Sequence, residues 1–253
     1  MPTDRTRGRV LDAQIDVLGW ADAILRPIKW ADQRESRYVA VCNVHVVVTA
    51  SRDIGYRQII NDADMAAPDG APVAWMLRRL GFAGQCRISG PDLMWALCER
   101  CAIERVPVYF IGGKESTLTT LRARLRQAFP ALEIVGSESP PFRKVTPVED
   151  AGTVERINAS GARIVFVGLG CPAQERWMAA HRGRVQAVMI GVGAAFDFHA
   201  GTINRAPAWM QQCGLEWLHR LLSEPRRLWR RYLATNTLFI LGAARQLMRG
   251  RQL

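Results

Sequence analysis

The sequence predicts an α/β fold with a mainly parallel sheet and helices on both faces. Short apolar runs alternate with longer segments of helical periodicity through the middle of the chain. Several apolar runs end in paired glycines, and none shows the polar alternation of a half-exposed strand. Both observations favour a Rossmann-like sheet that is buried on both sides. We expect this α/β unit to cover residues 1–200 and a basic helical appendage to cover residues 201–253.

The expected elements of the first hundred residues are the less distinct ones. They are, in order, a strand at 38–42, one or two helical pieces within 44–60, a strand at 65–67, and helices at 71–80 and 92–102. The tripeptide Pro68-Asp69-Gly70 favours a turn between strand and helix. Cys98 and Cys101 fall within a helical pattern, without a second pair at zinc-site spacing. They are therefore interpreted as ordinary thiols, and no metal site is expected.

The second hundred residues alternate more clearly. We expect strands at 106–111, 132–135, 162–167 and 185–190, with helices at 115–129, 148–160 and 173–181. In open parallel sheets, ligands bind where the carboxyl ends of strands lead into loops and helices. Four loops rich in glycine or polar residues are expected at that edge: 68–70, 112–114, 168–174 and 191–197. Glycines let backbone N–H groups approach a phosphate, so these loops favour a nucleotide-binding crevice.

Spacing alone leaves the chemistry of these loops open. Asp69 follows an expected strand, but Pro-Asp-Gly is also an ordinary turn sequence. His45 and His199 lie near the loops, where a local hydrogen bond is the commoner role, and Asp197 could position substrate or cap its loop. The 168–170 loop lacks the third glycine of the dinucleotide-binding fingerprint. A soluble nucleotide- or NAD-binding oxidoreductase is therefore kept only as an alternative.

Most of the positive charge belongs to the C-terminus. Residues 201–253 hold nine arginines and two glutamates, whereas the whole chain has a net charge of +11. Trp229, Tyr232 and the uncharged stretch 233–244 adjoin these arginines, a combination that favours an anionic membrane surface over nucleic acid. The stretch is shorter than the roughly 20 residues that span a bilayer. With no signal peptide in residues 1–9, we expect peripheral attachment to the cytoplasmic face of the membrane; a non-catalytic membrane-binding protein is the other alternative.

A series of motifs between residues 38 and 232 resembles a bacterial glycosyltransferase family, the WecG/TagA/CpsF type or glycosyltransferase family 26. Those motifs are Asn43, Ala63-Asp64 with Pro68-Asp69-Gly70, Arg87 with Gly90 and Asp92-Leu93, Gly168-Leu169-Gly170 with Pro172 and Gln174-Glu175, Gly191-Val192-Gly193 with Phe196-Asp197 and Gly201, Arg205-Ala206-Pro207, Gly214-Leu215-Glu216-Trp217-Leu218 with Arg220-Leu221, and Glu224-Pro225 with Arg227. The family includes enzymes of wall teichoic acid, enterobacterial common antigen, capsule and exopolysaccharide synthesis.

The resemblance implies an inverting, metal-independent transfer from a UDP-sugar to a sugar carried on polyprenyl diphosphate, without a cofactor. Asp69 would then be the general base. Substrate binding would involve Asn43, Arg87, Gln174, Asp197, Arg220, Arg227 and Arg231, with the last three as candidates for the diphosphate. The partners implied are the UDP-sugar, the lipid-linked acceptor and the anionic membrane, with no nucleic acid.

One position departs from the family pattern. Val41 stands where a threonine is common, two residues before Asn43, so a hydroxyl contact to substrate is missing. The sequence of residues 43–47 is more similar to that of the exopolysaccharide members of the family. We therefore expect a UDP-glucose donor first and an N-acetylmannosamine donor second. A homo-oligomer is also a reasonable expectation, because the appendage would expose apolar surface until it docks.

Overall fold

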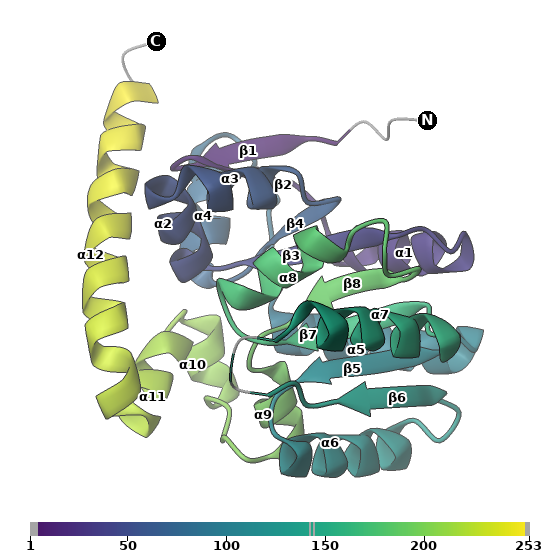
Figure 1. Cartoon of the computed structure of the whole chain (residues 1–253). Coiled ribbons are helices and arrows are strands. Elements are labelled where there is room, and N and C mark those ends of the chain that lie inside the picture. Colours follow the sequence, from purple (N-terminus) through teal and green to yellow (C-terminus); the bar gives the residue numbers. More distant parts are fainter. Residues whose placement is uncertain (1–4, 142, 144, 251–253) are drawn as a thin grey trace.

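A six-stranded parallel sheet forms the centre of the molecule (Figure 1). The structure is a computed structural model that describes residues 5–141, 143 and 145–250, except for the side chain of Arg227. The strand order is β4-β3-β8-β7-β5-β6, with every neighbouring pair parallel. The strands are β3 (Arg37–Cys42), β4 (Met65–Pro68), β5 (Val108–Gly112), β6 (Ile134–Glu138), β7 (Ile164–Gly168) and β8 (Val188–Gly191). The predicted α/β class with a parallel sheet is confirmed, and all six strands lie within a few residues of their expected positions.

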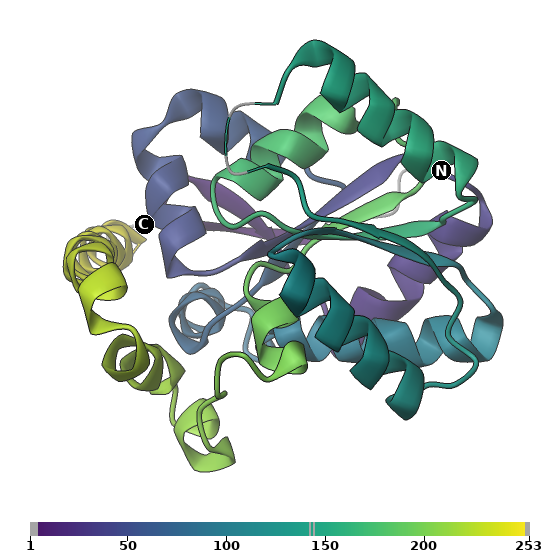
Figure 2. The same ribbon diagram turned by 60° about the horizontal axis from the view of Figure 1, so that its bottom comes forward.

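Helices cover both faces of this sheet, as Figure 2 shows with the sheet close to edge-on. On one face lie α2 (Val44–Arg52), α3 (Ile54–Asn61), α7 (Pro147–Ala159) and α8 (Ala173–His181); on the other lie α1 (Trp20–Asp32), α5 (Gly90–Glu104), α6 (Glu115–Ala128) and α9 (Ala195–Ala200). Successive strand side chains enter alternate cores: Tyr38 and Ala40 pack with the first group, and Val39 and Val41 with the second. Burial on both faces explains why these strands read as continuous apolar runs.

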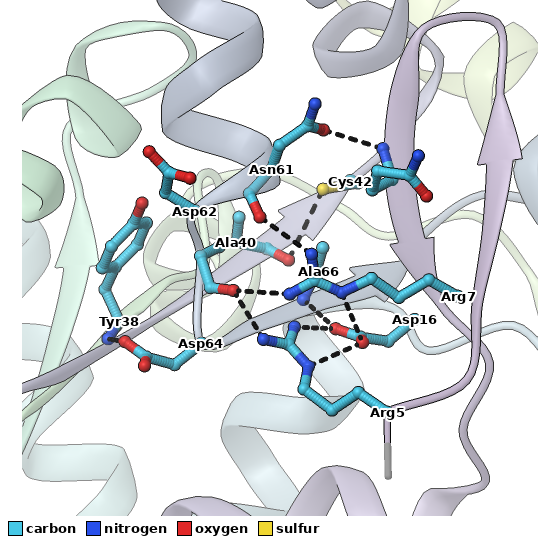
Figure 3. A network of polar contacts seen from close by, with 12 residues as sticks. Arg5, Arg7, Asp16, Tyr38, Ala40, Cys42, Asn61, Asp62, Asp64 and Ala66 are labelled. Atoms are coloured by element: carbon cyan, nitrogen blue, oxygen red, sulfur yellow. Dashed lines mark hydrogen bonds and ion pairs between the residues drawn. The ribbon is translucent and has the colours of Figure 1, made fainter. Parts of the chain in front are cut away.

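Two elements near the N-terminus were not predicted. An antiparallel hairpin, β1 (Arg7–Val10) and β2 (Ala13–Asp16), precedes α1. Its Asp16 carboxylate is buried, pairs with Arg5 at 2.6 Å, and accepts a 2.6 Å hydrogen bond from the Ala66 backbone N–H (Figure 3). Because β4 is an edge strand, this contact satisfies an N–H that has no neighbouring strand. Helix α1 carries Pro27 in its interior, which weakens the usual sequence signal for a helix.

The C-terminal segment, residues 201–250, is helical as expected. After α4 (Ala71–Arg79) and the elements above, the chain ends in α10 (Ala208–Gln212), α11 (Glu216–Ser223) and α12 (Pro225–Gly250). Helix α12 runs beside α2 (Figure 1), and Phe239 and Ala243 join the core cluster that contains Val46. The Leu11 backbone N–H also donates a 2.8 Å hydrogen bond to Gln246. The segment is thus packed firmly against the N-terminal part of the chain.

Several apolar side chains of α12 remain exposed, and one of them, Ile240, also borders a cavity. Leu233, Ile240 and Leu241 are 66, 65 and 50 % exposed. Throughout the part of the chain that the structure describes, no helix combines the length and the hydrophobicity required to cross a bilayer.

Candidate functional site

A cavity of about 950 Å³ opens at the carboxyl ends of β3, β4, β7 and β8. Helix α2, after β3, and α9, after β8, leave the sheet on opposite faces, so these adjacent strands form a switch point in the topology. The cavity is lined by three of the four predicted loops, those at 68–70, 168–174 and 191–197. Helices α11 and α12 contribute further lining side chains, among them Glu216, Trp217, Arg220, Arg231, Tyr232 and Phe239.

The fourth predicted loop does not line this cavity. At Gly112, a Cβ atom would lie 2.6 Å from the carbonyl oxygen of Gly168, so this loop packs tightly against the end of β7. The loop after β3, which spacing alone did not single out, takes part instead through Asn43 and His45. The reason is the strand order, since β3 and not β5 adjoins β8.

Asp69 occupies the first position after β4. Its backbone N–H donates to the Cys42 carbonyl at 3.0 Å, which extends the β3–β4 pairing by one residue and fixes the start of the loop. The Gly70 N–H donates to the Asp69 carboxylate at 2.7 Å, and Gly70 adopts a φ of +79° that favours glycine. The Asp69 side chain is 18 % exposed and lines the cavity.

The pKa of the Asp69 carboxyl is raised above its ordinary value. Burial is the main cause, and the nearby Glu216 carboxylate adds to it. The Arg87 guanidinium, the Gly70 N–H and a hydrogen bond from the Asn43 side chain act in the opposite direction. A carboxylate with an elevated pKa is a stronger proton acceptor than an ordinary aspartate, and it remains partly open to a ligand.

Asn43 connects this carboxylate with α2. Its side-chain oxygen caps the helix by accepting hydrogen bonds from the N–H groups of His45 at 3.0 Å and Val46 at 3.2 Å. The same side chain bonds Asp69. Asn43 thereby caps α2 and also positions the Asp69 carboxylate. A simple turn at residues 68–70 would not require this contact.

Arg87 lies between two carboxylates. Its Nε atom is 3.7 Å from Asp69 Oδ1, and its Nη2 atom forms an ion pair with Glu216 of α11. The other Glu216 oxygen lies 3.4 Å from the Nε of Arg205, which in turn pairs with Asp92 in the first turn of α5 at 2.7 Å. This network joins the C-terminal segment to the loops of the sheet. Sequence reasoning placed Glu216 and Arg205 in family motifs but assigned them no role.

Both polar atoms of the Gln174 side chain form hydrogen bonds within the protein. Its side-chain oxygen accepts from the Gly193 N–H at 3.1 Å, and its amide donates to Glu175 at 2.7 Å. Gln174 is 4 % exposed, and Glu175 is fully buried with a pKa that burial raises. Gln174 therefore ties the loop after β7 to the loop after β8, while still lining the cavity.

Asp197, Arg220 and Arg231 also line the cavity. Asp197 accepts a 3.2 Å hydrogen bond from Thr202, and Arg220 stacks on the Phe198 ring at 5.5 Å. Arg231 stacks on Tyr232, and its Nε has no hydrogen-bond partner among the described residues. The seventh substrate-binding residue predicted, Arg227, is in α12, but its side chain lies outside the described residues.

The two histidines near the loops differ in position. His45 lines the cavity, and its pKa is lowered by burial and by the positive charge of Arg231. His199 bonds the Pro91 carbonyl at 2.9 Å and stacks on Trp95, so it serves a local structural purpose. Several aromatic side chains of the wall, Trp75, Trp217 and Tyr232, were not singled out as site residues from the sequence.

Among the described residues, no group of three or more histidine, cysteine, aspartate or glutamate side chains is placed to hold a metal ion. The thiols of Cys98 and Cys101 are free and buried in α5.

Comparison with known protein families matches residues 8–253 to the Glycosyl transferase WecG/TagA/CpsF family. The match spans the sheet, the cavity and the C-terminal segment together. Membership implies a nucleotide-sugar donor, a lipid-linked acceptor and a part in cell-surface polysaccharide synthesis. With its parallel sheet, its cavity at the switch point and this match over nearly the whole length, the chain belongs to the WecG/TagA/CpsF family of glycosyltransferases.

Proposed function

We propose that this protein is an inverting, metal-independent hexosyltransferase that moves a sugar from a UDP-sugar to a sugar on polyprenyl diphosphate. The observation that carries the proposal is the partly exposed Asp69 carboxylate, held by Asn43 and Gly70 in a cavity that arginines of α11 and α12 also line. The product would serve cell-surface polysaccharide synthesis, with exopolysaccharide as the favoured polymer.

Asp69 is the proposed general base. The acceptor hydroxyl attacks the anomeric carbon of the donor, a new C–O bond forms, and the bond to the UDP oxygen breaks. The hydroxyl proton passes to the Asp69 carboxylate during this step. The raised pKa of Asp69 supports this role, because it increases the proton affinity of the carboxylate. A single displacement of this kind inverts the anomeric configuration.

The departing UDP gains negative charge, and arginines are suited to stabilise it. Arg220 of α11 and Arg231 of α12 line the cavity. Each guanidinium group can bind two phosphate oxygens at once. Arg227 is assigned the same role from the family motif alone. Asn43, Gln174 and Asp197 are proposed to position the sugars, either directly or through the loops they hold. No cofactor is assigned.

Residues 201–253 are proposed to be a membrane-facing appendage to the catalytic unit at residues 1–200. The exposed apolar side chains Leu233, Ile240 and Leu241 share α12 with a group of arginines, which suits an anionic bilayer surface. Attachment to the inner face of the cell membrane would bring the cavity close to a lipid-linked acceptor. A homo-oligomer formed through the same apolar face is the competing use of this surface.

The donor sugar is proposed from the wall of the cavity. Val41, which is 5 % exposed, lines the cavity where many family members offer a threonine hydroxyl. An apolar contact at this position favours a donor that does not need this hydrogen bond. UDP-glucose is therefore proposed first and UDP-N-acetylmannosamine second.

The test is UDP release from a panel of UDP-sugars, with and without polyprenyl-diphosphate-linked sugars and in the presence of EDTA. Acceptor-dependent release from one donor would support the proposal and identify the sugar. Release that requires a divalent metal would contradict the metal-independent mechanism. Vesicle binding without turnover across donors and acceptors of several sugar types would favour a non-catalytic membrane-binding protein.

A further inference from the structure

The Arg87 guanidinium forms its close ion pair with Glu216 and not with Asp69, the proposed base. Its Nη2 pairs with Glu216, whereas its Nε stays 3.7 Å from Asp69 Oδ1 and has no hydrogen-bond partner among the described residues. A free arginine beside an aspartate commonly forms a two-pronged pair, which lowers the basicity of the carboxylate. The position of Glu216 thus determines how closely Arg87 neutralises Asp69.

Glu216 is itself fixed by the C-terminal segment and by α5. It is the first residue of α11, and its second oxygen lies 3.4 Å from the Nε of Arg205. Arg205 is held by both oxygens of Asp92, which also bonds the helix-capping Ser89. These residues come from distant parts of the chain, since Arg87 and Glu216 are separated by 129 in residue number. Glu216 therefore reaches Arg87 through the packing of α11 against the loops of the sheet.

The network is not electrically balanced. Three carboxylates, those of Asp69, Glu216 and Asp92, share the two guanidinium groups of Arg87 and Arg205. Glu216 is only 18 % exposed, so its field at Asp69 is screened less than that of a surface charge. Other elements also direct ionisable groups into the cavity, namely His45, Arg78, Cys171, Asp197, Cys213, Arg220 and Arg231.

We propose that Glu216 is a positioning residue for Asp69: it holds the Arg87 guanidinium away from a close pair with that carboxylate. The inference rests on the proposed role of Asp69. It extends that role by making the C-terminal segment a determinant of basicity as well as of membrane contact. The effect of Glu216 on Asp69 has the expected sign, because its charge raises the pKa of that carboxyl.

The experiment is an NMR titration of the Asp69 carboxyl, assigned by its loss in Asp69→Asn, in the full chain and in Glu216→Gln. We expect the pKa of Asp69 to fall by roughly half to one pH unit in Glu216→Gln, a shift typical of a partly buried charge pair. Glu216→Asp, which keeps the charge, should retain most of the elevation. Glu104→Gln is the matched control, because it removes a partly exposed carboxylate from an ion pair with Arg100 and does not alter the lining of the cavity.

An unchanged or raised pKa of Asp69 in Glu216→Gln would overturn the proposal, as would an equal fall in Glu104→Gln. If Glu216→Gln does not fold, Glu216→Ala carries the test, with the same fall in the pKa of Asp69 expected. The acid limb of the rate profile should move in step with the titration. Absence of turnover in the unaltered chain would count against the proposed function alone, since the titration does not depend on activity.

Discussion

Replacement of Asp69 by asparagine tests the proposed base with little change in shape. The asparagine oxygen can still accept the 2.7 Å hydrogen bond from the Gly70 N–H, and the backbone contact to Cys42 is unaffected. What is lost is the negative charge and the ability to take a proton. Loss of a general base typically costs a factor of about 10²–10⁴, which corresponds to roughly 2.7–5.5 kcal/mol in the activation barrier.

The same substitution should not lower stability. Because folding raises the pKa of the Asp69 carboxyl, the folded state binds its proton more tightly than the unfolded state does. The contribution of Asp69 to stability is therefore fully present below the unfolded pKa of about 3.9. It is lost as the pH rises through the folded value. Above the folded value the ionised carboxylate is a net cost, so at such a pH Asp69→Asn should unfold at the same or a higher temperature.

The assay is acceptor-dependent UDP release, measured across pH together with thermal unfolding. The unaltered protein should lose kcat/KM as the pH falls through the raised pKa of Asp69, because only the ionised form accepts the proton. Asp69→Asn should lose this acid limb along with most of its turnover. A variant that keeps full kcat with the same acid limb would refute the role of Asp69. If Asp69→Asn loses activity because it unfolds, the argument that this substitution leaves stability unchanged or raised would be wrong.

Three further changes probe the appendage and the edge of the sheet. A triple variant with serine at Leu233, Ile240 and Leu241 should bind anionic vesicles more weakly. The loss should be roughly 1–2 kcal/mol for each side chain that enters the bilayer, and vesicle sedimentation measures it. Phe239→Ala should lower the free energy of unfolding by about 3–5 kcal/mol because Phe239 is 5 % exposed within the core. Asp16→Ala should cost about 3–5 kcal/mol, because it leaves the buried Ala66 N–H and the partly buried Arg5 guanidinium without this partner. Denaturant titration measures both losses of stability.

Matched substitutions separate these effects from general damage. Val148→Ser alters an 82 % exposed side chain on α7 and should leave vesicle binding unchanged. Leu222→Ala, at a position 71 % exposed, and Asp22→Ala, in an exposed pair with Arg26, should each change stability by less than about 1 kcal/mol. If the serine triple variant binds vesicles as tightly as the unaltered protein, α12 is not the membrane contact. If Phe239→Ala or Asp16→Ala matches its control, the packing described for that residue does not hold.

The central elements could be predicted because burial on both faces leaves a simple signature. The apolar run at 162–167 predicts a strand, which the structure has at Ile164–Gly168, and α8 (Ala173–His181) covers the helix predicted from about residue 173 to 181. The β1–β2 hairpin could not be predicted in this way. It is stabilised by a long-range contact with the edge strand β4, through Asp16, which a local sequence pattern does not reveal. Helix α1 was hidden by Pro27, whose cost tertiary packing offsets.

The site was only partly predictable for a similar reason. Asp69 could be placed after a strand, but local spacing did not distinguish a base from a turn residue. The family motif supplied that role, while the geometry shows which groups surround the carboxylate. Glu216 meets Arg87 only through the docking of α11, which no pattern in the sequence specifies. Gln174 was interpreted as a substrate ligand, whereas the structure shows that it also ties two loops together.

The anomeric configuration of the product tests the central claim most directly. The purified protein would be given a UDP-sugar of defined configuration and a polyprenyl-diphosphate-linked acceptor, and the new glycosidic linkage would be assigned by its NMR coupling constant. A single displacement assisted by Asp69 predicts an inverted configuration, formed by the unaltered protein and nearly absent with Asp69→Asn. A product with retained configuration would contradict the account, because retention requires a different sequence of steps at this carboxylate.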